Sequence, residues 1–146
     1  MRVRQARERD LEALHPLLQQ LMKTTAGGRR AMLAAALRHE GYAAWVVEVA
    51  KTPVGFVDVF VFPDAAHGHR IGLVNNLVVD TRFRGRGLGE RLLRTAIAHC
   101  RKRRAAELHV WTGFDNAPAI GAYRKLGFVQ RGALLEMVLT PERAKR

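Results

Sequence analysis

A glycine-rich run in the second half of the chain has the composition of an anion-binding turn. Residues 84–89 read Arg-Gly-Arg-Gly-Leu-Gly, after an apolar, strand-like stretch at 71–79 and before a helix-like stretch at 88–103. The first N–H groups of a helix have no acceptor inside it, and the aligned peptide dipoles leave positive charge at that end. Glycines let the backbone take left-handed torsions and close its N–H groups on an anion. The order strand, glycine turn, helix therefore predicts a phosphate site.

The residues of this predicted site are two arginines, three glycines and the first helical residue: Arg84, Gly85, Arg86, Gly87, Leu88 and Gly89. Two nucleotide motifs are excluded. A P-loop continues with Lys-Ser or Lys-Thr, whereas this run continues with Glu90-Arg91. A dinucleotide fingerprint has its glycines in a G-x-G-x-x-G pattern near the start of a βαβ unit, whereas these glycines alternate and follow the midpoint of the chain. The alternative is a glycine-rich surface turn before an ordinary amphipathic helix.

Length and composition predict one soluble domain over residues 1–146, because 48% of the residues are hydrophobic and the length suffices for one core. No apolar run reaches the ~20 residues of a membrane span, and Met1–Gln5 is not an apolar signal segment. We therefore expect a cytoplasmic protein that does not enter a membrane. The one cysteine, Cys100, excludes an internal disulfide. It continues a four-residue apolar spacing from Leu88, so we expect a buried helix residue rather than a nucleophile.

The positive charge is concentrated near the glycine run. The formal net charge is +12, and residues 82–104 hold nine Arg or Lys residues and one acid, Glu90, which gives this window a net +8. Such a field attracts a polyanionic cofactor. A nucleic-acid footprint is the alternative source of a basic patch, and the cluster at 101–104 is also typical of a solvated helix end.

Periodicity and turn residues predict the elements that position the run. We expect strands at residues 3–6, 42–50, 54–62, 70–79, 107–112, 128–131 and 134–139, and helices at 10–23, 28–39, 88–103 and 116–126. The strand–helix–strand unit from 71 to 112 implies at least one parallel pair. The predicted fold class is α/β (α+β), with a mixed central sheet and about four flanking helices.

Three motifs together resemble the GNAT superfamily of acetyl-coenzyme A (acetyl-CoA)-dependent N-acetyltransferases. They are Leu77-x-Val79, Arg84-x-x-Gly87-x-Gly89, and Asn116-x-x-Ala119-x-x-x-Tyr123-x-x-Leu126-Gly127-Phe128. The order of elements is also similar to that family from Met1 to about Leu139. The resemblance implies a mostly antiparallel sheet in which the strand at 71–79 carries a bulge and splays from the parallel strand at 107–112.

The resemblance also implies which residues bind acetyl-CoA. The amides of residues 84–89 would bind its pyrophosphate, and the backbone of Leu77, Val78 and Val79 would pair with the pantetheine arm. An N–H group of that strand segment would stabilise the oxyanion of the reacting thioester. Asn116, Ala119 and Tyr123 would face the cofactor from the helix at 116–126.

Acetyl transfer to an amine needs a proton acceptor for the amine and a proton donor for the departing thiolate. Tyr123 is the candidate acid, because it lies two helical turns after Asn116 and shares its face; a residue at the edge of the core is the alternative. Many family members carry a base carboxylate three or four residues before the valine matched by Val79, where this chain has Asn75 and Asn76. These amides would hold a relay water or bind the substrate, or one would satisfy the backbone at a bulge.

The remaining titratable residues give weaker signals. Asp58 is a carboxylate on a face otherwise formed by Phe56, Phe60 and Phe62, so it is a candidate substrate-ammonium contact, unless that face is partly exposed. His109 is expected to be structural, and the His67-Gly68-His69 run has too few partners for a metal site. We therefore predict no metal.

The resulting hypothesis is an enzyme that transfers acetyl from acetyl-CoA directly to an amine. The acceptor, a small-molecule or peptide amine, is not identified by the sequence, and a homodimer stays open. A non-catalytic CoA- or nucleic-acid-binding regulatory module with the same fold is one alternative, although nothing in the sequence resembles an RNA-reading aromatic motif. A CoA-dependent enzyme with a longer acyl donor or an alcohol acceptor is the other.

Overall fold

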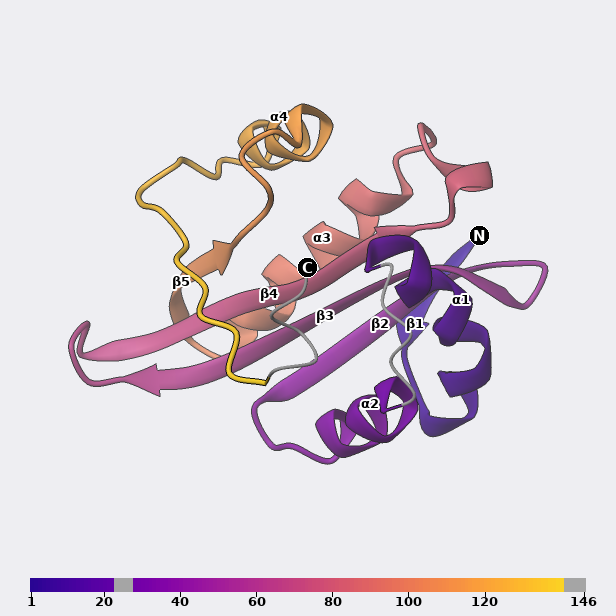
Figure 1. The fold of residues 1–146 in the computed structure, drawn as a ribbon, viewed down its shortest axis with the longest axis horizontal. Helices are drawn as coiled ribbons and strands as arrows, with labels where there is room; N and C mark the ends of the chain where they lie inside the picture. The colour runs from indigo at the N-terminus through magenta and orange to yellow at the C-terminus, as the bar shows by residue number, and fades with distance from the viewer. Residues whose placement is uncertain (23–27, 141–146) are drawn as a thin grey trace. The chain divides into compact units, whose positions relative to one another are not determined.

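The computed structural model describes residues 1–22 and 28–140, and the chain divides into two compact units, Met1–Val110 and Trp111–Arg146 (Figure 1). In its described residues, the first unit holds five strands, three α-helices and two short 3-10 helices. They are β1 (Arg2–Gln5), η1 (Glu8–Asp10), α1 (Leu11–Leu21), α2 (Arg29–Leu37), β2 (Tyr42–Val49), β3 (Thr52–Asp64), β4 (His69–Val79), η2 (Thr81–Phe83), α3 (Leu88–Lys102) and β5 (Ala105–Val110). The predicted end of the first helix, Lys23, lies outside the described residues.

The sheet has the order β1-β2-β3-β4-β5, and its first four strands pair antiparallel. β4 and β5 pair parallel, which confirms the predicted mixed, mostly antiparallel sheet. The parallel pairing joins residues 70–74 to residues 105–110 and does not extend to the rest of β4, which continues to Val79. The parallel pair is thus open beyond Val74, which agrees with the expected splay.

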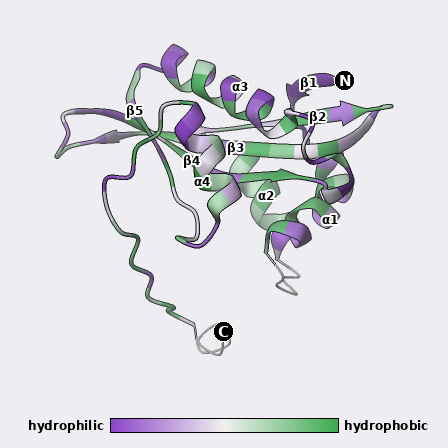
Figure 2. Cartoon of the chain, turned by 90° about the horizontal axis from the view of Figure 1, so that it is seen from above, coloured by the Kyte–Doolittle hydropathy of each residue, from purple (hydrophilic) through white to green (hydrophobic). Residues whose placement is uncertain are grey.

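Helices cover both faces of this sheet (Figure 2). α1 and α2 pack on one face, where Leu14, Leu17 and Leu33 are buried in a cluster with Phe56 and Val78. α3 packs on the other face through an apolar stripe whose members are all buried: Leu88, Leu92, Leu93, Ala96 and Cys100. Complete burial of a leucine side chain contributes about 1.5–3 kcal/mol, so this stripe holds α3, and with it the preceding glycine turn, against the sheet.

A β-bulge interrupts the β3–β4 ladder. Asp58 pairs with Asn76 but the next residue, Val59, pairs with Val74, so Asn75 is an extra residue in β4. Successive side chains of a strand alternate between faces, and one extra residue reverses that alternation. As a result Asn76 shares the α1/α2 face with Asp58, whereas Val74 lies on the α3 face.

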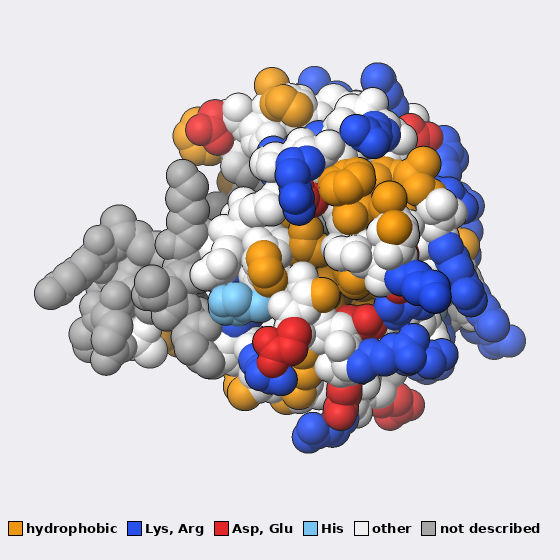
Figure 3. Space-filling model, turned by 90° about the vertical axis from the view of Figure 1, so that its right-hand side faces the viewer, with side chains coloured by type: hydrophobic (Ala, Val, Ile, Leu, Met, Phe, Trp, Pro, Cys, Tyr) orange, Lys and Arg blue, Asp and Glu red, His pale blue; other side chains and the backbone are white. Residues whose placement is uncertain are grey.

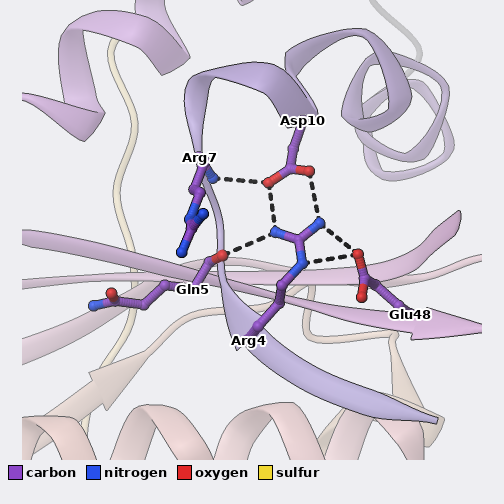
Figure 4. Close-up of polar contacts among 5 residues, drawn as sticks. All are labelled: Arg4, Gln5, Arg7, Asp10 and Glu48. Carbon is purple, nitrogen blue, oxygen red and sulfur yellow. Dashed lines mark hydrogen bonds and ion pairs between the residues drawn. The ribbon is translucent and has the colours of Figure 1, made fainter. Parts of the chain in front are cut away.

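An ion network fastens the start of the chain to the sheet (Figure 4). The Arg4 guanidinium donates to both carboxylate oxygens of Asp10 (2.8 Å each) and to Glu48 on β2. The backbone N–H of Arg7 also donates to Asp10 (2.8 Å). The Asp10 side chain is only 6% exposed, so these donors supply the hydrogen bonds that water would otherwise make.

The second unit contains α4 (Ala117–Lys125), one residue shorter at each end than the predicted helix. The strands predicted at 128–131 and 134–139 are wrong, because the structure assigns no strand to residues 128–140. A strand exists only when its N–H and C=O groups meet those of another strand. The apolar pattern of this segment predicts the conformation that it favours but not the presence of a partner.

Candidate functional site

The glycine run forms a left-handed turn at the start of α3. Gly85 has φ +74° and Gly87, the N-cap residue of the helix, has φ +73°. A Cβ at either position would meet no atom within 4 Å, so the glycines are needed for their torsions and not for space. The predicted glycine turn is therefore present, directly before the helix.

The amides of this turn lack backbone partners. Among the described residues, Arg91 is the first of α3 whose N–H reaches a backbone carbonyl, that of Gly87 (3.0 Å). The N–H groups of residues 85–90 have no described backbone acceptor. Free amides at a helix N-terminus are an anion-binding arrangement, because the N–H groups and the helix dipole both favour negative charge.

Cationic side chains surround the turn. The guanidinium groups of Arg82 and Arg86 lie over the Phe83 ring, 5.9 and 5.2 Å from its centroid. Arg82 also donates to the Asp80 carboxylate (2.8 Å), and this hydrogen bonding lowers the pKa of Asp80 to about 2. Lys and Arg side chains also gather along one side of the face drawn in Figure 3. The predicted basic surroundings of the turn are thus present in the structure.

The last residues of β4 present backbone groups away from β3. The N–H groups of Asn76 and Asp80 point toward β3, where they donate to Asp58 and to the Val54 carbonyl. Alternate residues of a strand point their N–H groups in opposite directions, so those of Leu77 and Val79 point to the open side. This is the edge that β5 leaves unpaired, and a ligand could add to it as an extra strand.

A buried polar cluster lies beside the bulge. The Asp58 side chain accepts hydrogen bonds from the Tyr42 hydroxyl (2.6 Å), the Asn76 backbone N–H (2.6 Å) and the Asn76 side-chain amide (3.0 and 3.1 Å). Asp58 is 3% exposed, and burial raises the pKa of its carboxyl. Asn75 is exposed and Asn76 is half-buried. The structure therefore brings Asp58 and Asn76 together and leaves Asn75 apart, while the predicted ammonium contact of Asp58 stays a prediction.

Tyr42 is a site residue that the sequence did not reveal. It reaches Asp58 from the neighbouring strand although their backbone partners differ, since Ala44 pairs with Asp58 and Tyr42 with Phe60. The strands predicted at 42–50 and 54–62 follow one another in the chain, but this diagonal contact between them depends on the register.

In the second unit, α4 carries the Asn116 and Tyr123 motif. The Asn116 side chain accepts from the Ala119 N–H (3.4 Å) and so caps the helix. At the other end Gly127 has φ +96°, its N–H donates to the Arg124 carbonyl (3.0 Å), and that of Phe128 donates to the Tyr123 carbonyl (3.1 Å). This is a Schellman motif, and the Tyr123 and Phe128 rings make its apolar contact. Burial raises the pKa of Tyr123.

The other candidates give no further catalytic group. Cys100 is buried, and burial raises the pKa of its thiol to about 11, which agrees with the prediction of a structural residue. His67, His69 and His109 surround the Glu107 carboxylate at the surface. Within residues 1–22 and 28–140 no three His, Cys, Asp or Glu side chains form a group that could hold a metal ion. No helix in this part of the chain is long and apolar enough to span a membrane.

Comparison with known proteins finds similarity in sequence and in fold. An uncharacterized N-acetyltransferase from Methanocaldococcus jannaschii is 34% identical over 88 residues, which are 60% of this chain and 39% of the relative. A mycothiol acetyltransferase from Saccharomonospora viridis is 39% identical over 66 residues, 45% of this chain and 22% of the relative. The chain thus spans well under half the length of both relatives.

A solved structure has the same fold at low sequence identity. AAC(6′)-Iy, in complex with the bisubstrate analogue CoA-S-monomethyl-acetylneamine, aligns with a TM-score of 0.83 at 17% identity, over 95% of this chain and 97% of that one. The model of the acetyltransferase (GNAT) family matches residues 5–128, a range that includes the glycine turn, the bulged strand β4 and α4. This chain belongs to the GNAT acetyltransferase family.

Proposed function

We propose that this protein transfers an acetyl group from acetyl-CoA directly to an amine. The observation that carries the proposal is the left-handed glycine turn, whose amides at the N-terminus of α3 lack backbone acceptors in a chain that belongs to an acetyltransferase family. This turn would hold the pyrophosphate of acetyl-CoA, with the arginines at its rim adding positive charge.

The backbone of β4 would place the reactive end of the same molecule. Leu77 and Val79 direct their backbone groups to the open side of the strand, where the pantetheine arm would add as a further strand. The N–H group of Leu77 would then donate to the thioester carbonyl oxygen. A preorganised donor of this kind is commonly worth about 3 kcal/mol of transition-state stabilisation.

The transfer forms one N–C bond and breaks one C–S bond. The neutral amine attacks the thioester carbon, its surplus proton passes to water held by Asn75 and Asn76, and the departing thiolate takes a proton from the Tyr123 hydroxyl. The proton released to water then restores the Tyr123 phenol through solvent. The raised pKa of Tyr123 keeps its phenol protonated at neutral pH, as an acid must be. Cys100 is buried and protonated, which supports direct attack without an acyl-enzyme.

For the acceptor we propose a small-molecule or peptide amine. The names of the compared proteins mention mycothiol and, in the bisubstrate analogue, acetylneamine. The two names point to different compounds. The family's common feature would therefore be the acetyl donor, while the amine is selected by side chains that differ between members.

The experiment that tests this function combines donor binding with turnover. Calorimetry should detect acetyl-CoA binding, and a panel of aminoglycosides, amino sugars, polyamines and N-terminal peptides should include an amine that releases free thiol. Turnover of that amine with acetyl-, propionyl- and succinyl-CoA then shows which acyl group the enzyme transfers. Absence of acetyl-CoA binding, together with nucleic-acid affinity that falls steeply with salt, would overturn the proposal in favour of the binding module.

A further inference from the structure

We infer that Asp58 is a positioning residue: its buried carboxylate anchors the β4 bulge and thereby fixes the direction of the Leu77 N–H group. This inference rests on the proposed acetyl transfer, in which that N–H group donates to the thioester carbonyl. In this role Asp58 acts through the bulge and needs no contact with the donor.

The anchor consists of short contacts to one side of the bulge. Asp58 Oδ1 accepts from the Asn76 backbone N (2.6 Å) and from Asn76 Nδ2 (3.1 Å), while Oδ2 lies 3.0 Å from the same Nδ2. Oδ2 also accepts from the Tyr42 hydroxyl (2.6 Å). One carboxylate thus binds the backbone and the side chain of the residue that directly follows the extra residue, Asn75.

An ionised carboxylate satisfies all of these donors. Each of its oxygens accepts and neither donates, which suits a position that faces a backbone N–H, an amide NH₂ and a hydroxyl. An asparagine at position 58 has the same shape, but its own NH₂ group would face one of those donors. Burial of a charge at 3% exposure is unfavourable, and the surrounding donors are what make it tolerable.

The register of the bulge decides where the Leu77 N–H points. Because the Asn76 N–H is bonded to Asp58, toward β3, the next N–H along the strand points to the open side. Movement of the bulge by one residue would reverse this alternation and turn the Leu77 N–H toward β3. Bulges re-aim backbone and side-chain groups beside active sites, and here the lock on the bulge is a side chain of the neighbouring strand.

The test reads the donor carbonyl directly and needs no acceptor. Isotope-edited infrared spectra of acetyl-CoA labelled with ¹³C at the carbonyl should show a lower stretching frequency when it is bound to the wild-type protein than when it is free. In Asp58→Asn we expect at least about half of this shift to be lost, with acetyl-CoA affinity within about threefold of wild type, since the glycine turn is unchanged. Turnover should fall about tenfold or more, with little change in KM for acetyl-CoA.

Val57→Ala is the matched control. Val57 is also completely buried on β3 and pairs with Leu77, but its side chain lies on the opposite face of the strand from the Asp58 carboxylate and makes none of its hydrogen bonds. This variant should be less stable than wild type and keep the full infrared shift. If Val57→Ala loses as much of the infrared shift as Asp58→Asn does, Asp58 only stabilises the fold in general, and the inference is overturned.

The remaining outcomes separate the two proposals. Wild-type protein that binds no acetyl-CoA overturns the proposed function and the positioning role with it. If the carbonyl frequency of acetyl-CoA is lowered in the wild-type protein and equally lowered in Asp58→Asn, only the positioning role of Asp58 is overturned. If Asp58→Asn does not fold, NMR of the wild-type protein decides the anchor: the Asn76 amide proton should resonate far downfield and exchange slowly, and an ordinary shift with rapid exchange would overturn it.

Discussion

The Nε of Arg84 donates a hydrogen bond to the carbonyl oxygen of Val79 (3.0 Å). Val79 ends β4 and Arg84 begins the glycine turn, so this bond connects the two backbone segments that we propose hold the pantetheine arm and the pyrophosphate. The Val79 carbonyl lies on the open side of β4, where no strand of the described sheet accepts or donates. A side chain thus satisfies the backbone at the point where the strand leaves the sheet.

Arg84→Ala should therefore weaken acetyl-CoA binding by about tenfold or more, because it removes a charge from the turn and the bond that holds the turn to β4. Arg94→Ala is the control: Arg94 is an exposed residue of α3 whose guanidinium pairs with Glu90 (2.8 Å). Calorimetry of both variants gives the comparison. Equal dissociation constants for the two would mean that the charge of the helix surface, and not the Arg84 contact, matters.

Gly87→Val should abolish most of the acetyl-CoA affinity. Its φ of +73° costs a side-chain-bearing residue about 1–2 kcal/mol, and relief of that strain would turn the amides away from the ligand. Gly28→Val is matched in space, since a Cβ at either glycine meets no atom within 4 Å, but Gly28 has φ −83°. We expect unchanged affinity in Gly28→Val, and normal affinity in Gly87→Val would argue against the turn as the pyrophosphate site.

Tyr123→Phe should lower turnover by about ten- to a thousandfold and leave acetyl-CoA affinity nearly unchanged. The phenylalanine keeps the ring that packs against Phe128 (5.7 Å between centroids), so the end of α4 should be preserved. Single-turnover kinetics and calorimetry measure the two quantities, and circular dichroism checks the fold. Unchanged turnover would show that Tyr123 is not the acid and that its role is to pack in the Schellman motif.

Arg4→Ala should destabilise the fold by about 3–5 kcal/mol near pH 7, because it leaves the Asp10 and Glu48 carboxylates largely buried and unpaired. Hydrogen bonding from Arg4 lowers the pKa of Asp10 below its ordinary 3.8. This contribution is therefore present above pH ~4 and is lost as the pH falls through the lowered value. Denaturant titrations should show a smaller difference in the free energy of unfolding between wild type and Arg4→Ala at low pH than at pH 7. Arg38→Ala, which removes an exposed pair with Glu8, should have little effect on that free energy at either pH.

His67 should titrate above the ordinary imidazole pKa of 6.5, because its ring hydrogen-bonds to Asp64 (3.0 Å). The sign follows from the direction of the shift: any stability that it adds is complete below pH 6.5 and disappears as the pH rises through the raised value. NMR titration of the imidazole protons measures this. Asp64→Asn should return the pKa toward its ordinary value, and an unchanged pKa in that variant would show that Asp64 is not the cause.

Local pattern predicted most elements of the first unit, because each is determined by its own residues. The four-residue apolar spacing along α3 and the glycines before it predicted a helix that starts at Leu88, as the structure has it. The aromatic and β-branched runs predicted β2 and β3, and the turn between them uses Ala50 and Lys51 at positive φ. The strands predicted at 128–131 and 134–139 failed because strand pairing depends on residues elsewhere in the chain.

The features of the candidate site also separate into those that depend on near neighbours in the sequence and those that depend on strand pairing. The sequence by itself determined the glycine turn, its positive surroundings and the caps of α4, since these depend on torsions, charges and hydrogen bonds among near neighbours. Only the tertiary structure decided that Asp58, Asn76 and Tyr42 meet, that Asn75 is the extra residue of a bulge, and that the Leu77 N–H points to the open side of β4. The physical reason is that register is a property of two paired strands, and a one-residue change in it redirects every group that follows.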